Sequence, residues 1–172
     1  ILDLVGEPGT EDAAFKTDIN TCLPVIPQHQ SLMCAVKMSA IFGPKKLTLI
    51  SQAVETGDDV SSALSKYDTN GAFDTLLSRL KEIRDKHLYR VAIDAEWSDI
   101  QPAIARIALK MMEHLNKEDP FLLNTYQAYL RGSLRQFEEH VARSKSQGFQ
   151  LGAKIVRGAY MTYENKKNPG LL

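Results

Sequence analysis

The sequence predicts an α/β fold in which parallel strands alternate with helices, and it favours a (β/α)8 TIM-type barrel. Four segments are apolar almost throughout, which is typical of strands buried on both faces of a parallel sheet. The last three begin near residues 90, 121 and 151, about 30 residues apart, which is the length of one βα unit. No Gly-x-Gly-x-x-Gly follows these segments, which counts against a Rossmann dinucleotide site and an open doubly wound sheet.

The predicted strands are short, and they account for only part of a barrel. They cover residues 31–38, 90–94, 120–126 and 151–156, and residues 1–5 are a candidate for a further strand. A barrel of this type typically takes about 250 residues, whereas this chain has 172. We therefore expect one domain, residues 1–172, that holds four or five βα units of an incomplete barrel with two exposed sheet edges.

Helices are predicted between the strands, where apolar residues recur at three- and four-residue spacing. The clearest helical face consists of Ile100, Ile104, Ile107, Met111 and Leu115. Similar faces are predicted within 47–54, 73–83 and 134–141. Ser98 and Gln101 resemble a capping box at the start of the first helix, and Gly148 stands where a C-terminal cap is expected.

Composition and charge exclude several classes of partner. Lysine and arginine equal aspartate and glutamate at 21 each, so no overall field attracts nucleic acid, and no nucleic-acid partner is expected. No apolar run approaches the roughly 18 residues of a membrane span. The chain starts at Ile1 without a basic, apolar leader, so we expect a targeting segment that has been removed or a longer parent protein.

Metal and thiol chemistry is not expected. Cys22 and Cys34 have neither metal-type spacing nor the pattern of a disulfide framework, and Cys34 is interpreted as a core residue of its strand. The four histidines are dispersed and are assigned to loops or polar helix faces: His29, His87, His114 and His140. The segment 68–71 lacks the later glycine and the distal glutamate of a calcium loop and is predicted to be a turn.

Each predicted strand is followed by a side chain that can contact a ligand. Lys37, Asp94, Gln127 and then Arg157 follow the four strands in order, and the carboxyl ends of barrel strands gather the active site. The simplest partner for Lys37 is Asp94, one strand over. A structural salt bridge explains that pair alone, so the four ends together predict a ligand site.

Four motifs in order resemble the proline dehydrogenase family. They are Ala-Val-Lys-Met-Ser-Ala at 35–40, Ile-Asp-Ala-Glu at 93–96, Asn-Thr-Tyr-Gln-Ala-Tyr at 124–129 and Ala-Lys-Ile-Val-Arg-Gly-Ala-Tyr at 153–160. The last two are similar to the eukaryotic, mitochondrial branch. The resemblance implies a (β/α)8 barrel that binds FAD and oxidises L-proline to Δ1-pyrroline-5-carboxylate. It also implies a quinone acceptor and peripheral contact with the matrix side of the inner mitochondrial membrane.

The same resemblance implies a set of site residues. The catalytic residues would be Asp94 and Lys154. The residues that contact proline would be Lys37, Tyr160 and Glu7. The residues that contact FAD would be Ala95, Gln127, Lys154, Arg157, Gly158 and Ala159. The family's later strands, which the adenine half of FAD should contact, and its Arg-x-x-Arg-Arg-like substrate clamp have no counterpart in this chain. We therefore expect this chain alone to bind FAD poorly and to turn over little proline.

Three other interpretations remain open from the sequence. A relative that acts on hydroxyproline would carry the same motifs. A Schiff-base aldolase would use Lys37 at a strand end as its nucleophile. A truncated, non-catalytic fragment would keep the family assignment and lose the activity.

Overall fold

Five strands form one parallel sheet whose spatial order follows the chain. A computed structural model describes residues 2–3, 33–86 and 90–167. The strands pair in the order β1 (Leu2–Asp3), β2 (Met33–Val36), β3 (Arg90–Ile93), β4 (Leu122–Gln127) and β5 (Ala153–Val156). This order differs from a doubly wound sheet, where the strand order reverses at a switch point. It is the order of a barrel wall, and all five predicted strand positions are confirmed.

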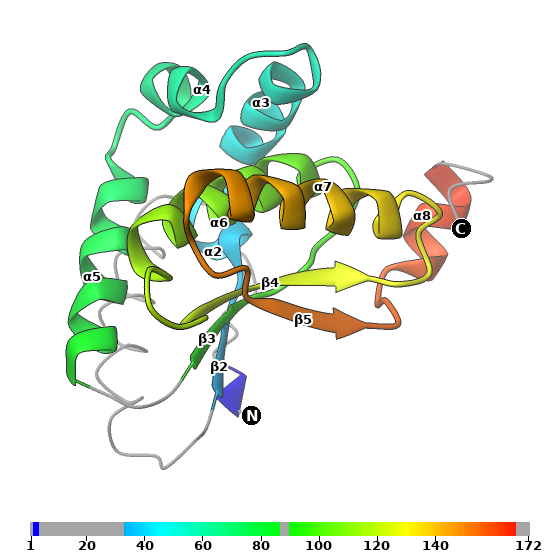
Figure 1. Cartoon of the computed structure of the whole chain (residues 1–172). Coiled ribbons are helices and arrows are strands. Elements are labelled where there is room, and N and C mark those ends of the chain that lie inside the picture. The colour runs from blue at the N-terminus through cyan, green and yellow to red at the C-terminus, as the bar shows by residue number, and fades with distance from the viewer. Residues whose placement is uncertain (1, 4–32, 87–89, 168–172) are drawn as a thin grey trace.

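Seven described helices accompany the sheet. They are α2 (Met38–Phe42), α3 (Pro44–Glu55), α4 (Val60–Tyr67), α5 (Ala72–Lys86), α6 (Gln101–Leu115), α7 (Ser133–Gln147) and α8 (Met161–Lys167). Figure 1 shows α6 and α7 running along one face of the sheet, with α3 and α4 stacked beyond α6. The crossovers of consecutive βα units therefore place helices on the same side, as a barrel requires.

The core lies between the sheet and helix α6. The predicted apolar face of α6 is confirmed, because Ile100, Ile104 and Ile107 have no exposed surface. This face packs against β4 on one side and α3 on the other. Cys34 is 1% exposed in the same core, as its position in an apolar strand predicted. None of the described helices is long and apolar enough to cross a membrane.

The turn predicted at 68–71 is confirmed, and it starts a helix. The Gly71 N–H donates to the Asp68 carbonyl at 3.1 Å, and Gly71 adopts a positive φ of 68°. The Asp68 carboxylate accepts the backbone N–H groups of Ala72 and Phe73 at 3.0 and 2.8 Å. Asp68 thus satisfies two of the orphan donors at the start of α5.

Two local predictions are wrong. The reciprocal capping box at Ser98 and Gln101 does not form, since the Gln101 side chain accepts the Glu96 N–H at 2.7 Å. His140 lies on a buried rather than a polar face of α7, where it is 4% exposed. Its Nδ1 lies 2.8 Å from the Tyr126 hydroxyl on β4. The tyrosine supplies a polar partner that a helix pattern alone does not reveal.

Candidate functional site

Strand register places four polar residues side by side at the carboxyl edge of the sheet. Val36 pairs with Ile93, and Ile93 pairs with Asn124, so the following residues Lys37, Asp94 and Thr125 are neighbours. Thr125 in turn pairs with Lys154 on β5. We call Lys37, Asp94, Thr125 and Lys154 the polar row.

The polar row faces away from the helices. Tyr126 contacts Phe137 of α7 edge-on, with ring centroids 5.2 Å apart, so Tyr126 faces the helical layer. Successive strand residues point to opposite faces, so Thr125 and Gln127 point to the other face. In a barrel that face is the interior, which makes the row part of the barrel mouth.

An ion pair spans the row from β5 to β3. The Lys154 ammonium lies 2.7 Å from Asp94 Oδ1, and the two side chains are 21% and 17% exposed. Neighbouring strands lie about 4.8 Å apart, so the lysine crosses the whole width of β4. Asp94 is therefore paired with Lys154, and the predicted pairing of Asp94 with Lys37 is wrong. A lysine side chain is long enough to reach the second strand, which made adjacency a poor guide.

Apolar side chains and a glycine lie below the row on the same face. Ala35, Ala92 and Leu123 are in register across β2, β3 and β4. Gly152 continues this layer, and a Cβ there would lie 2.0 Å from the Leu122 carbonyl oxygen. The glycine is thus required by the close approach of two backbones.

Glu96 lies behind the row and was not predicted as a site residue. It is 1% exposed, and its Oε1 accepts the Ser39 backbone N–H at 2.9 Å. Burial raises the pKa of Glu96, and the hydrogen bonding with Ser39 and then the Lys37 ammonium partly offset this by favouring the charged form. The glutamate ties the segment after β2 to the segment after β3. The feature of the sequence that could have pointed to Glu96 is its position two residues after Asp94.

Gln127 ties the segment after β3 to the segment after β5. Its amide Nε2 donates to the Glu96 carbonyl at 3.0 Å, and its Oε1 lies 3.4 Å from the Ala159 N–H. The second contact is long for a hydrogen bond. The buried amide of Gln127 thus has one firm partner, and its oxygen retains acceptor capacity toward the mouth.

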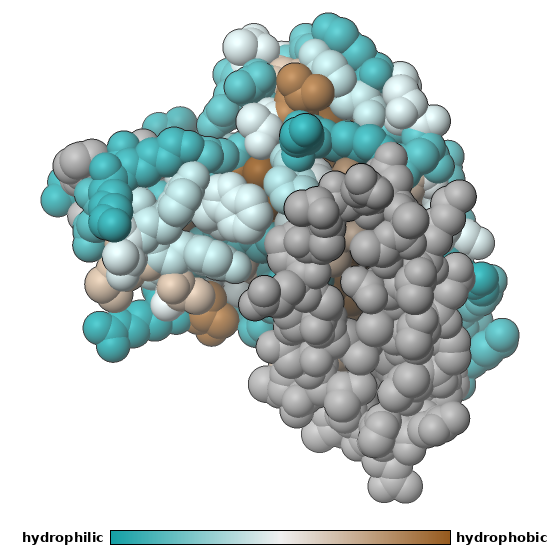
Figure 2. Space-filling model, turned by 180° about the vertical axis from the view of Figure 1, so that it is seen from behind, coloured by the Kyte–Doolittle hydropathy of each residue, from teal (hydrophilic) through white to brown (hydrophobic). Residues whose placement is uncertain are grey.

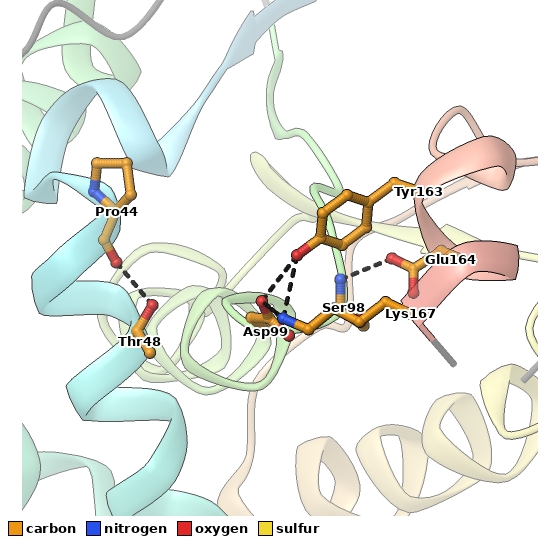
Figure 3. A network of polar contacts seen from close by, with 7 residues as sticks. All are labelled: Pro44, Thr48, Ser98, Asp99, Tyr163, Glu164 and Lys167. Carbon is orange, nitrogen blue, oxygen red and sulfur yellow. Dashed lines mark hydrogen bonds and ion pairs between the residues drawn. The ribbon is translucent and has the colours of Figure 1, made fainter. Parts of the chain in front are cut away.

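Aromatic and acidic side chains secure the segment that follows β5. Tyr160 contacts Trp97 edge-on, with ring centroids 6.1 Å apart. Burial raises the pKa of Tyr160, and the nearby Glu96 and Asp94 carboxylates raise it further. Glu164 is 1% exposed and accepts the Ser98 N–H at 2.8 Å (Figure 3). Contacts between the segment after β3 and the segment after β5 therefore hold Tyr160 beside the polar row.

A second group of contacts joins α8 to the same loop at the surface. The Tyr163 hydroxyl donates to Asp99 at 2.8 Å, and the Lys167 ammonium also contacts Asp99 (Figure 3). The Lys167 contact lowers the pKa of Asp99. These side chains are exposed or nearly so, and exposed pairs of this kind typically contribute about 0–1 kcal/mol.

The glycine after β5 has a structural reason to be there. Gly158 has a φ of 138°, and a Cβ at this position would lie 1.3 Å from the Tyr129 ring. The family resemblance implies that Gly158 contacts FAD, and the structure shows that the Tyr129 ring already occupies one side of this glycine. Arg157 and Ala159, on either side, are exposed.

The predicted site residues fall into three groups. The structure brings together at the mouth Asp94, Lys154, Gln127, Ala159 and Tyr160. Lys37 and Ala95 are half-buried at the ends of β2 and β3, whereas Arg157 is exposed after β5. Glu7 lies outside the described residues. Besides Glu96, prediction missed Ser39, Trp97 and Glu164, all of which act through backbone or ring contacts.

Sequence comparison relates the whole chain to one family. A family model described as proline dehydrogenase matches residues 1–170. "Proline dehydrogenase 1, mitochondrial" from Drosophila melanogaster is 45% identical over 82 residues, which are 48% of this chain and 12% of that protein. "Hydroxyproline dehydrogenase" from Xenopus laevis is 37% identical over 90 residues, 52% of this chain and 19% of that protein. The matched stretches thus span well under a quarter of these two relatives.

Structure comparison supports the fold. A crystal structure of proline utilization A from Bdellovibrio bacteriovorus, inactivated by N-propargylglycine, superposes with a TM-score of 0.73 at 16% identity. The match covers 96% of this chain and 18% of that one. Together with the sequential parallel sheet and the row of polar strand ends, the match over residues 1–170 shows that this chain belongs to the proline dehydrogenase family.

Proposed function

We propose that the protein binds FAD at the mouth of the barrel and oxidises L-proline to Δ1-pyrroline-5-carboxylate, with quinone as electron acceptor. The observation that carries the proposal is the Lys154–Asp94 ion pair across the polar row, in a chain of the proline dehydrogenase family. Residues 1–172 are proposed to be one part of a single barrel domain. The activity belongs to the whole protein that contains this part.

The residues at the mouth fit a flavin. A ring edge that carries carbonyl and ring-nitrogen acceptors suits the Lys154 ammonium, while the free acceptor capacity of Gln127 suits a ring N–H donor. The exposed Arg157 guanidinium suits the pyrophosphate. Ala95, Gly158 and Ala159 add backbone and small side chains that take little space. These residues are proposed as the contacts of FAD, together with Lys154 as a catalytic residue.

Substrate contacts are proposed for the other side of the mouth. Proline offers a carboxylate and a ring nitrogen, and the half-buried Lys37 ammonium can bind the carboxylate. Tyr160 would close the cavity with its ring, and Glu7 is proposed as a further contact. Asp94 holds Lys154 in place and is proposed to shape the substrate end of the site.

The chemistry requires orientation more than proton transfer by the protein. FAD, when bound, would supply a hydride acceptor: one proton with two electrons would leave the ring carbon next to the proline nitrogen, and the nitrogen would lose a second proton as the C=N bond of the product forms. The residues of this chain would align the substrate, exclude water with Tyr160 and Trp97, and place a positive charge beside the ring. Among the described residues, no group of three or more His, Cys, Asp or Glu side chains is placed to hold a metal ion.

A mitochondrial location is proposed from the relatives that the chain resembles. Several carry the word mitochondrial in their names, including those of Drosophila melanogaster and Homo sapiens. We propose the matrix side of the inner membrane, with peripheral contact that brings the flavin near quinone. The described residues on the face drawn in Figure 2 are mainly hydrophilic.

The direct test is a spectrum of the purified protein. The whole protein that contains this chain is incubated with FAD, desalted and mixed with L-proline under anaerobic conditions, and flavin absorbance is followed. Retained flavin that bleaches with proline and recovers with a soluble quinone supports the proposal. Retained flavin that proline does not bleach contradicts the substrate, and failure to retain flavin contradicts the cofactor.

A hydroxyproline substrate is the second candidate, because a hydroxyproline dehydrogenase is among the relatives. The two substrates differ by one ring hydroxyl, which a polar partner in the site can select. The same bleaching experiment with trans-4-hydroxy-L-proline separates them. A kcat/KM higher for proline supports the first candidate, and the reverse order supports the second.

A further inference from the structure

Thr125 occupies the centre of the polar row. It follows Asn124, the partner of Ile93, and it is the direct partner of Lys154. Asp94 therefore lies beside it on β3, and Lys154 lies beside it on β5. The Lys154 side chain must pass over Thr125 to reach Asp94 Oδ1 at 2.7 Å. The threonine is thus enclosed between the two charged residues of the pair.

The Thr125 hydroxyl makes no hydrogen bond with the described residues in this arrangement. The residue is 3% exposed, and its Oγ1 has no hydrogen-bond partner among the described residues. Asp94 is satisfied by Lys154 instead. A buried hydroxyl without a partner costs free energy, and valine has the same shape without that cost. A threonine here therefore calls for a second state in which the hydroxyl is bonded.

The proposed function supplies such a state. For Lys154 to contact a flavin, its ammonium has to turn from Asp94 toward the mouth, and Asp94 is then left as a half-buried carboxylate. Thr125 is the adjacent residue on the same face, and a rotation about its χ1 angle can direct the hydroxyl toward Asp94. A hydroxyl that donates to a carboxylate compensates part of the lost ion pair.

We propose that Thr125 is a positioning residue: its hydroxyl donates to Asp94 when Lys154 leaves that carboxylate for a bound ligand. The inference rests on the proposed function, because the ligand is FAD. It assigns Thr125 no contact with the substrate. The polar row then has two arrangements. Asp94 pairs with the Lys154 ammonium in the free protein, and it accepts the Thr125 hydroxyl when FAD is bound.

The test uses Thr125→Val and Thr125→Ser in the whole protein. FAD affinity is measured by flavin fluorescence quenching, and thermal unfolding is measured without FAD. Thr125→Val should melt at the same or a higher temperature than the unmodified protein, because it removes an unsatisfied hydroxyl. It should weaken FAD binding about tenfold, the size typical of one hydrogen bond to a charged group. Thr125→Ser should restore the affinity.

Thr48→Val is the matched control. The Thr48 hydroxyl donates to the Pro44 carbonyl at 3.0 Å within helix α3 (Figure 3), and Thr48 is not part of the polar row. The same change of side chain should leave FAD affinity unchanged. A general effect of threonine-to-valine substitution on the fold would appear in both variants.

Each contrary outcome has a distinct meaning. If Thr125→Val binds FAD as tightly as the unmodified protein, the role of Thr125 is overturned and the proposed function stands. If Thr125→Val melts at a lower temperature without FAD, the hydroxyl is already bonded in the free protein and the role is again overturned. If the unmodified protein does not bind FAD, the proposed function and this inference fall together.

Discussion

The buried carboxylate of Glu164 accepts the backbone N–H of Ser98 at 2.8 Å and thereby joins the segment after β5 to the segment after β3. Ser98 follows the Asp94 segment, whereas Glu164 follows Tyr160 by four residues and lies on α8. The Glu164 N–H also donates to the Tyr160 carbonyl at 2.9 Å. One side chain thus connects the two loops that supply most of the candidate site.

Removing the Glu164 carboxylate should loosen α8 locally. Glu164→Ala leaves the Ser98 N–H without its acceptor, and such a loss typically costs about 1–3 kcal/mol. We expect faster amide hydrogen exchange across 161–167, with smaller changes in α6 and β4. Glu164→Gln keeps an acceptor oxygen and should retain most of the protection. Equal exchange rates in Glu164→Ala and the unmodified protein would contradict this role of Glu164.

The Lys154–Asp94 pair should show strong coupling. Lys154→Met leaves the Asp94 carboxylate, only 17% exposed, without its partner. We expect Lys154→Met to lower the free energy of unfolding by about 1–3 kcal/mol. In a protein that already carries Asp94→Asn, the same substitution should lower it by less. Chemical denaturation of the single and double variants measures the coupling. Strictly additive losses would show that the pair contributes nothing beyond its separate side chains.

The buried charge of Glu96 should lower the free energy of unfolding at neutral pH. Burial raises the pKa of Glu96, so the folded protein binds more protons than the unfolded chain above the ordinary glutamate pKa. The free energy of unfolding therefore falls as pH rises through this window. Glu96→Gln keeps an acceptor for the Ser39 N–H and removes the buried charge. We expect it to be more stable than the unmodified protein at neutral pH, and equal or lower stability in urea unfolding would contradict this.

His140 should make stability depend on pH in the opposite sense. Burial, aided by Arg106 and Arg143, lowers the pKa of His140 to about 4, whereas an unfolded histidine titrates near 6.5. Between these values the unfolded chain binds more protons, so stability falls as pH decreases from about 6.5 to about 4. The full contribution of this shift is on the order of 3 kcal/mol. His140→Gln can still bond Tyr126, and the stability difference between the two proteins should vary across this range.

Gly158 should tolerate no side chain. Alanine there combines a φ of 138° with a Cβ 1.3 Å from the Tyr129 ring. We expect Gly158→Ala to lose about 1–3 kcal/mol or to displace the ring. Gly132 is the matched control, because no atom lies within 4 Å of its built Cβ and its φ is −82°. Thermal unfolding of both variants tests the difference.

Periodicity predicted the large elements because burial controls them. β3 and α6 are nearly uniform in burial on the faces that their apolar patterns specify. Helices α2, α4 and α8 have only 5, 8 and 7 residues, too short for a repeating pattern, and they were missed. Segment lengths and strand starts also predicted which strand ends share one edge of the sheet.

Side-chain partners were less predictable than positions. Lys37 is the neighbour of Asp94 in register, yet Lys154 pairs with Asp94 from two strands away. Strand order does not specify how far a flexible lysine reaches. Glu96 and Glu164 were missed because each bonds a backbone N–H, and backbone groups leave no mark in a sequence.

The edge-on contact of Trp97 with Tyr160 gives the protein an internal optical probe. Trp97 is the chain's single tryptophan, and it lies in the segment that carries Asp94. Tryptophan emission from this chain therefore originates beside the candidate site. A flavin bound there would accept excitation energy from the indole, so quenching of the ultraviolet emission would report cofactor binding without a label. Movement of Tyr160 would change the same signal even before a cofactor is added.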